Sequence, residues 1–395
     1  MKKIFSILFA SALLFVNFSV LSFSADKDYS HLKGTSINVY NWGEYISDGE
    51  DDTLDVNARF EELYGIHVNY TNFESNENMY NKLKGGGASY DVIIPSDYMI
   101  DRLVKEDMLF ELDFSNIPNY KYILEDYRGL YYDKDEKYSV AYTASYTGLI
   151  YNTKMVQEAP DSWAALWDTK YSGNILMFNN PRDGFAIAQF MLGQDINNVS
   201  KEEWDIAATQ LKIQKPLVSS YVMDEVFDKM IGGDAALAPY YAGDFITMHD
   251  ENPDLAFVYP KEGVNFFVDA MCIPKCAQNK EAAEVYINYM LSEEAGVANA
   301  NYICYGSPNE LVLNSDDYEL KDDPILYPEA GTVKSDIFEG LDNETLQYMT
   351  DLWNDVKVEK TTMLDAYIGL GSFTVVAVIF GIASAVKKKK REAMY

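Results

Sequence analysis

Short apolar runs alternate with segments of helical periodicity along most of this 395-residue sequence. Residues 56–64 carry apolar side chains at helical spacing and are followed by Gly65, the residue type that commonly ends a helix. Residues 66–70 then alternate apolar and polar side chains as a strand does, and the apolar run 92–94 stops at Pro95. Strands that alternate with helices predict an α/β fold with a parallel sheet.

The same alternation recurs in the second half of the chain. Ser162 is a candidate N-cap for a helix that carries Trp163 and Trp167, and an apolar run at 175–178 precedes a helical segment at 186–191. A chain of this length is too long for one ordinary core, whereas its hydrophobic fraction of 48% is enough for two packed units. The sequence therefore predicts two α/β lobes.

The N-terminal segment has the three regions of a secretory signal. Basic residues at 2–3 are followed by an apolar run at 4–16, and small residues precede Ala25. We expect residues 1–24 to be a signal peptide, with the mature chain beginning near Ala25. No cysteine follows the apolar run, so we expect no lipoprotein anchor there.

An uncharged apolar segment at 367–386 precedes the basic run Lys387–Arg391. At about 1.5 Å per residue it is long enough to cross a hydrocarbon core of about 30 Å, and a basic run after such a span is typical of the cytoplasmic side. We expect a transmembrane helix at 367–386, a basic cytoplasmic tail at 387–395, and residues 25–365 on the extracellular or periplasmic side. The alternative is a buried core helix, but such helices are rarely apolar on every face.

The formal charge of −30 argues against nucleic acid as a partner and makes polycations plausible partners. The chain has three histidines and three cysteines, which leaves little material for a histidine-based triad or a zinc cluster. We therefore expect no metal and no cofactor, and enzyme classes that depend on these residues lose support.

Aromatic and acidic residues gather where predicted strands end. Ligands of parallel α/β sheets bind at the carboxyl ends of strands, so the turns after Tyr40, Ile94, Phe178, Ala238 and Val268 are the first candidates for a site. These turns contain Asn41–Tyr45, Pro95–Tyr98, Asn179–Asp183, Pro239–Tyr241 and Asp269. Carboxylates pair with ammonium groups, and aromatic faces attract cations and cover methylene chains. This chemistry suits an amine, although a sugar or peptide site stays open.

Several longer stretches between about Ile37 and Val356 resemble a known family. They are Y-N-W-G-E-Y from Tyr40, F-E-S-N-E-N-M-Y-N-K-L-K from Phe73, Y-D-V-I-I-P-S from Tyr90, P-K-E-G from Pro260 followed by F-V-D-A-M-C-I-P, Y-G-S-P-N from Tyr305, and L-Y-P-E-A from Leu326. On these stretches the chain resembles the extracytoplasmic spermidine/putrescine-binding proteins of polyamine ABC transporters.

The resemblance implies a two-lobed periplasmic-binding-protein fold with a ligand cleft between the lobes. The first lobe is expected at 34–145 and 268–313, and the second at 146–267 and 314–360. The implied function is that of a monomeric, non-enzymatic receptor, which binds putrescine or spermidine and delivers it to an ABC permease. The apolar segment at 367–386 would tether this receptor to the membrane.

The family's ligand-binding positions, carried across by local motif, are Trp42, Glu44, Tyr45, Ser96, Tyr98, Asn180, Asp183, Tyr241, Phe267, Asp269, Tyr305 and Glu339. Asp183 falls where the family has a glutamate that binds an ammonium, and Asp269 falls on the aspartate that resembles the central amine anchor. Asn180 departs from the pattern, because the family commonly has an aspartate there that holds the far amine of spermidine. The preference between putrescine and spermidine therefore stays open.

These side chains also have purely structural interpretations. Trp42 and Tyr45 could cap a strand, Phe267 could lie in a core, and Asp183 could be a first-turn acid favoured by a helix dipole. Asp269 is the strongest candidate, because a carboxylate inside an apolar strand would be costly without a cationic partner.

Two rival functions remain. The same fold could bind a sugar, an iron complex or another cation, or the chain could be an extracellular glycoside hydrolase with paired carboxylates. Gly85–Gly87 lacks the ending of a phosphate-binding loop and predicts a helix end instead. A disulfide between any two of Cys272, Cys276 and Cys304 is also open.

Overall fold

The computed structural model describes residues 27–87 and 89–358. The predicted signal peptide at 1–24, the predicted transmembrane helix at 367–386 and the basic tail at 387–395 lie outside these residues. Within the described ranges, no helix combines the length and the apolarity needed to cross a membrane.

The strands of the described chain are short except for two. Their bounds are β1 Ser36–Trp42, β2 His67–Phe73, β3 Val92–Ile93, β4 Ser139–Asn152, β5 Ile175–Phe178, β6 Val218–Val222, β7 Leu237–Tyr241, β8 Leu255–Val258, β9 Val264–Cys272 and β10 Ser335–Ile337. They are hydrogen-bonded in the order β2-β1-β3-β9-β4-β7-β5-β6, with β10 beside β9 and β8 beside β4.

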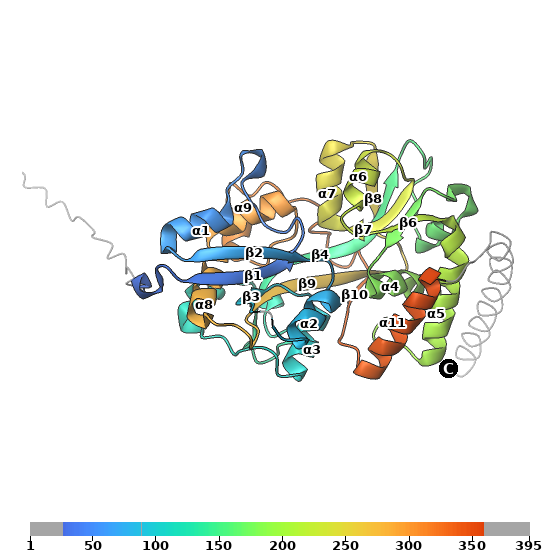
Figure 1. Ribbon diagram of the computed structural model, residues 1–395. Helices are drawn as coiled ribbons and strands as arrows, with labels where there is room; N and C mark the ends of the chain where they lie inside the picture. The colour runs from blue at the N-terminus through green and yellow to red at the C-terminus, as the bar shows by residue number, and fades with distance from the viewer. Residues whose placement is uncertain (1–26, 88, 359–395) are drawn as a thin grey trace, which may run out of the picture.

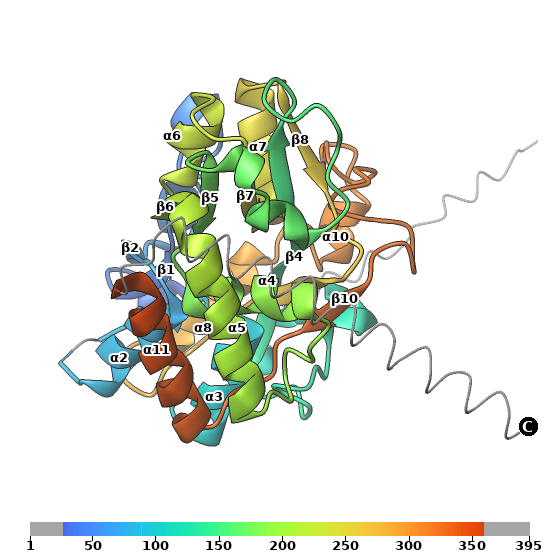
Figure 2. The same ribbon diagram turned by 90° about the vertical axis from the view of Figure 1, so that its right-hand side faces the viewer.

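Helices cover the faces of this sheet (Figures 1 and 2). The α-helices are α1 Val56–Tyr64, α2 Asn76–Lys84, α3 Asp97–Lys105, α4 Pro181–Leu192, α5 Lys201–Gln214, α6 Val226–Ile231, α7 Ala242–Glu251, α8 Lys280–Met290, α9 Glu293–Ile303, α10 Glu310–Leu313 and α11 Asn343–Val358. Short 3₁₀ helices lie at Ser30–Leu32, Glu50–Asp52, Phe114–Asn116, Pro118–Tyr122, Glu125–Tyr127, Trp163–Trp167, Thr169–Tyr171 and Lys215–Leu217.

The molecule has two α/β lobes, and β4 and β9 run through both of them (Figure 1). One lobe carries β1–β3 with α1, α8 and α9, and the other carries β5–β8 with α4–α7 and α11. Along β4, residues up to Tyr146 pair with β9, whereas residues from Thr147 pair with β7. Since β4 pairs with β9 along its first half and with β7 and β8 along its second, it carries the chain from one lobe to the other as extended backbone.

The sheet is mixed, so the prediction of a parallel sheet is correct only for its outer parts. β1 pairs in parallel with β2 and β3, and β5 pairs in parallel with β6 and β7. In the centre, β9 is antiparallel to β3 and β4, because adjacent long strands carry the chain between the lobes in opposite directions. The predicted turn after Val268 is also wrong, since β9 continues to Cys272 and Asp269 lies inside it.

Local sequence signals explain several elements. Asp55 accepts a hydrogen bond from the backbone N–H of Ala58 at the start of α1, and Gly65 ends that helix with a left-handed φ of 66°. The predicted helix after Ser162 is a single 3₁₀ segment, in which the Ser162 side chain accepts from the N–H of Ala164. The helix end predicted at the glycine run is confirmed, because α2 stops at Lys84.

Apolar cores lie in both lobes, and the core of the second lobe continues into α2 and α3 of the first. In the first lobe, Phe60 of α1 packs edge-on against Tyr286 of α8, with ring centroids 5.0 Å apart. In the second lobe, Phe185 of α4 packs against Trp204 of α5 and Trp353 of α11, with centroids 5.0 and 5.8 Å apart. Of these helices, α4 has its first turn at the cavity described below.

The three cysteines are free thiols. Cys272 is buried at the end of β9, and the Sγ atom of Cys276 lies 3.6 Å from the carbonyl oxygen of Tyr90. Cys304 is buried at the end of α9 and adopts a left-handed φ of 56°. None of the disulfides left open by the sequence is therefore formed in this structure.

Candidate functional site

A cavity between the lobes collects side chains from many parts of the sequence. It encloses about 830 Å³ of space outside protein atoms, including its opening to solvent. The predicted ligand-binding residues that line it are Trp42, Glu44, Tyr45, Ser96, Tyr98, Asn180, Asp183, Tyr241, Phe267, Asp269 and Tyr305. The fold thus brings all the predicted positions together except Glu339.

Glu339 is exposed and does not line the cavity, whereas its neighbour Phe338 is buried and does. The backbone of Glu339 serves as an anchor: its N–H donates to Asn197 at 2.8 Å, and its carbonyl oxygen accepts from Arg182 at 3.2 Å. The position that contributes a side chain to the cavity is therefore one residue earlier than the sequence predicted.

Asp269 lies inside β9 with 3% of its surface exposed. Its Oδ2 atom accepts a hydrogen bond of 2.7 Å from the hydroxyl of Tyr45, whereas its buried Oδ1 atom has no hydrogen-bond partner. Burial raises the pKa of Asp269 to about 6, while hydrogen bonds from Ser96 and Tyr45 act in the opposite direction. The site therefore holds a carboxylate oxygen that lacks a donor.

Asp183 occupies the first turn of α4 and is also buried. The hydroxyl of Tyr241 donates to its Oδ2 atom at 2.8 Å. Burial raises the pKa of Asp183 to about 7, against the opposing effects of Tyr241 and of the neighbouring Arg182. Asn180 begins the same helix, because its Oδ1 atom accepts from the N–H of Arg182 at 2.9 Å and so caps α4.

Two further buried or half-buried acids were not among the predicted residues. Asp244, in the first turn of α7, accepts a 3.1 Å hydrogen bond from the hydroxyl of Tyr305, and burial raises the pKa of Asp244 to about 8. Asp97, at the start of α3, accepts from the backbone N–H groups of Tyr98 at 2.6 Å and Val268 at 3.2 Å. Asp97 thus joins α3 to β9, and burial raises its pKa well above the ordinary range.

Asp244 had a weak sequence signal. It follows Tyr241 by three positions, and Asp183 follows Asn180 in the same way, so each acid occupies the third residue of a helix that begins at the cavity. A first-turn acid is also what a helix dipole favours, and the pattern alone therefore does not separate a binding role from a structural one.

Aromatic side chains form a connected wall of the cavity. The rings of Tyr45 and Tyr305 meet edge-on with centroids 5.1 Å apart, those of Tyr241 and Phe267 at 5.3 Å, and those of Phe267 and Tyr305 at 6.2 Å. Near the opening, Trp42 packs against Phe73 at 4.5 Å. Such ring faces attract cations and cover alkyl chains.

The rim of the cavity carries exposed acids from both lobes. Glu44 and Glu74 come from the first lobe and Asp224 from the second. Partial burial raises the pKa values of Glu44 and Asp224, and repulsion by nearby carboxylates raises them further. Asp224 is one of the carboxylates that repel Glu44. The rim therefore presents negative charge on both sides of the opening.

The charged side chains that line the cavity, among the described residues, are all acidic. Among the described residues that line it, the acids are Glu44, Glu74, Asp97, Asp183, Asp224, Asp244 and Asp269, and there is no lysine, arginine or histidine. Arg182 is buried behind the wall, where its guanidinium lies 4.6 Å from the ring centroid of Phe338. In the part of the chain that the structure describes, no group of histidine, cysteine or acidic side chains is arranged to hold a metal ion. The arrangement suits an organic cation.

Comparison with known proteins gives a consistent result. The family model for bacterial extracellular solute-binding proteins matches residues 56–328. The spermidine/putrescine-binding periplasmic protein 1 of Haemophilus influenzae is 32% identical over 82% of this chain and 89% of its own length. The putrescine-binding periplasmic protein PotF of Escherichia coli is 27% identical over 91% of this chain and 99% of its own length.

Solved structures share the fold. A chain from Listeria monocytogenes, 33% identical, superposes with a TM-score of 0.78 over 82% of this chain and all of its own length. The spermidine/putrescine ABC transporter substrate-binding protein PotD of Streptococcus pneumoniae, 32% identical, gives a TM-score of 0.68 over 82% of this chain and 98% of its own. These relatives bind solutes for transporters and are not enzymes, so the glycoside-hydrolase alternative is set aside.

Proposed function

This chain belongs to the bacterial extracellular solute-binding protein family, and we propose that its ligand is a linear polyamine, putrescine or spermidine. The observation that carries the proposal is the acidic cavity, in which the buried Oδ1 atom of Asp269 has no partner. An ammonium group would supply the missing donor, and the aromatic wall would cover the methylene chain. The names of the relatives support this ligand class, because they describe spermidine/putrescine-binding and putrescine-binding proteins.

The ligand is proposed to close the lobes around itself. We assign 34–145 with 268–313 to the first lobe and 146–267 with 314–360 to the second. Asp269 then belongs to the first lobe and Asp183 to the second, so one polyamine contacts both and binds the closed state more tightly than the open state. The strands β4 and β9 would act as the hinge, since they carry the chain between the lobes.

The receptor is further proposed to be a membrane-tethered monomer that delivers the polyamine to an ABC permease. The tether is the apolar segment 367–386, with 387–395 in the cytoplasm. Expression of the full chain beside a chain that stops at residue 360 tests the tether: the full chain should stay with membranes after alkaline extraction, and the shortened chain should not. Release of both by alkali would contradict the tether without affecting the ligand.

A thermal-shift panel on the purified full chain in detergent tests the ligand. The compounds are putrescine, spermidine, spermine, amino acids, oligosaccharides and ferric complexes, because only a true ligand stabilises the folded protein by mass action. The proposal predicts stabilisation by at least one of the polyamines and by none of the others. Stabilisation by a sugar or a ferric complex alone would assign the cavity to that solute instead.

A further inference from the structure

A second groove between the lobes opens beside the cavity. The two spaces share Glu74, Asn180 and Met223 as lining residues, so the groove continues directly from the cavity wall. It encloses about 1350 Å³ of space, including its opening to solvent. Its walls come from α2 and α3 of one lobe and from α11 and the start of α4 of the other. Figure 2 shows α2, α3 and α11 near one another at the lower left of the molecule. We call it the α2–α11 groove.

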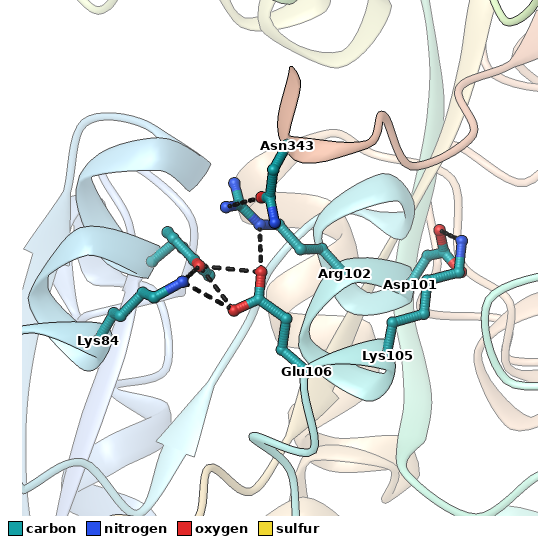
Figure 3. Close-up of polar contacts among 7 residues, drawn as sticks. Lys84, Asp101, Arg102, Lys105, Glu106 and Asn343 are labelled. Carbon is teal, nitrogen blue, oxygen red and sulfur yellow. Dashed lines mark hydrogen bonds and ion pairs between the residues drawn. The ribbon is translucent and has the colours of Figure 1, made fainter. Parts of the chain in front are cut away.

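The basic residue of this groove is already engaged. Arg102 is the one lysine, arginine or histidine among the described residues that line the groove. Its Nε atom donates to Glu106 at 3.0 Å and its Nη2 atom donates to Asn343 at 2.9 Å, which joins α3 to the first residue of α11 (Figure 3). Lys84 reaches the same Glu106 at 3.0 Å (Figure 3). The guanidinium of Arg102 is therefore engaged on the protein itself, although Glu106 pairs with two cations and this cluster keeps a net positive charge.

Glu77 connects the groove to the cavity. Its Oε1 atom accepts a 3.1 Å hydrogen bond from the hydroxyl of Tyr98, a residue of the cavity wall, whereas its Oε2 atom is buried and has no hydrogen-bond partner. Burial raises the pKa of Glu77, whereas hydrogen bonds from its own backbone N–H and from Tyr98, and the charges of Arg182 and Arg102, act in the opposite direction. A buried carboxylate oxygen without a donor is costly, so this atom has the same unmet requirement as Oδ1 of Asp269.

The rest of the lining suits a chain that carries both amines and methylenes. Amide side chains come from α2, α11 and the segment before α4, namely Asn78, Asn81, Asn179, Asn343 and Gln347. The oxygens of Asn78, Asn81 and Gln347 can accept hydrogen bonds from ammonium groups, whereas those of Asn343 and Asn179 already accept from Arg102 and Lys357. Leu346 and Met223 offer apolar surface between these amides. Glu74 and Glu77 supply the negative charge, so the groove offers two carboxylates and neutral acceptors beside the engaged Arg102, where the cavity has seven acids.

We propose that the α2–α11 groove is an extension of the ligand site, which takes the outer arm of a triamine or tetraamine and holds its terminal ammonium beside Glu74 and Glu77. The inference rests on the proposed function, because it assumes that a polyamine occupies the cavity. A four-carbon diamine occupies the cavity alone. The groove thus extends the range of ligands toward longer polyamines, even though Asn180 carries no charge.

Opposite charges placed at one position of the groove test this assignment. Gln347 lines the groove but not the cavity, is exposed on α11, and donates to Asp351 at 2.9 Å. Gln347→Arg places a positive charge in the groove and Gln347→Glu a negative one, with little expected effect on the fold. Calorimetry on the full chain would compare putrescine, spermidine and spermine with each variant.

The two variants should change the affinity for the longer polyamines in opposite directions and leave the affinity for putrescine nearly unchanged. Gln347→Arg should weaken spermidine and spermine binding by about tenfold, Gln347→Glu should strengthen both, and putrescine should change by about twofold or less. Equal changes for all three ligands, or no change for any, would overturn the groove assignment while leaving the cavity proposal intact. Failure of the unmodified chain to bind any of the three polyamines would overturn the proposed function instead, and this inference with it.

Discussion

Replacing Asp269 with asparagine should weaken polyamine binding and stabilise the empty protein at the same time. Asparagine keeps the shape of the side chain and can still accept the hydrogen bond from the hydroxyl of Tyr45. It removes the negative charge from a residue that is 3% exposed and that carries a buried oxygen without a partner. The two effects have separate physical origins and can be measured separately.

The magnitudes follow from the burial of Asp269. Loss of one partner from a buried, hydrogen-bonded charge pair costs about 2–5 kcal/mol, which corresponds to a roughly 30- to 5000-fold weaker affinity. In the empty protein, burial raises the pKa of Asp269 from 3.8 to about 6. Ionising this group at neutral pH therefore costs about 3 kcal/mol of folding free energy, and the asparagine variant should recover a similar amount.

Isothermal calorimetry measures the loss of affinity, and chemical denaturation without ligand measures the stability of the empty protein. Asp133→Asn is a matched control, because Asp133 is equally buried but accepts from the backbone N–H groups of Lys137, Tyr138 and Ser139 at 2.8–2.9 Å, away from the cavity. The control should lose stability and keep its affinity. Polyamine affinity of Asp269→Asn within about threefold of the unmodified chain would refute the assignment of Asp269. A less stable empty variant would refute the desolvation argument.

Three other predictions concern pH, packing and charge. Burial raises the pKa of Asp183 to about 7 and that of Asp244 to about 8, from 3.8 in the unfolded chain. The free energy of unfolding of the empty protein should therefore decrease as the pH is raised from about 4 to about 8, because both carboxyls must ionise in a buried position. An ammonium ligand favours the ionised carboxylates, so the thermal shift it produces should grow over the same range, and a flat profile would contradict both pKa values. Gly184→Ala should cost about 1–3 kcal/mol in chemical denaturation, because the added methyl would lie 2.5 Å from the ring of Trp353; an unchanged midpoint would contradict this packing. Asn180→Asp keeps an acceptor for the cap of α4 and adds a negative charge to the wall shared by cavity and groove. Competition titration should show that the affinity for spermidine rises about tenfold relative to that for putrescine. An equal rise in affinity for both ligands would contradict this prediction.

Local signals carried much of the fold prediction. Helix α1 was predicted from its periodicity and from Gly65, and the strand at 175–178 from its apolar run, because these signals act within a few residues. The direction of β9 depends on its pairing with β4, more than 100 residues away in sequence, and periodicity contains no information about such a pairing. The mixed centre of the sheet was therefore missed.

The residues of the candidate site also divide into those that the sequence predicted and those that it did not. Asp269 stood out in the sequence because a carboxylate inside an apolar strand is costly, and the structure places it in the cavity wall. Asp244 did not stand out, because an acid in the first turn of a helix has an ordinary structural explanation. Its contact with Tyr305, 61 positions away, is what brings it into the cavity, and that contact exists only in the folded chain.

The position of β9 late in the sequence also determines when the first lobe can be completed during synthesis. The ribosome makes β1, β2 and β3 long before it makes β9, which is the second sheet neighbour of β3. It also makes them before α8, whose Tyr286 packs against Phe60 of α1. The N-terminal lobe therefore lacks part of its sheet and part of its core until more than two thirds of the chain has been translated.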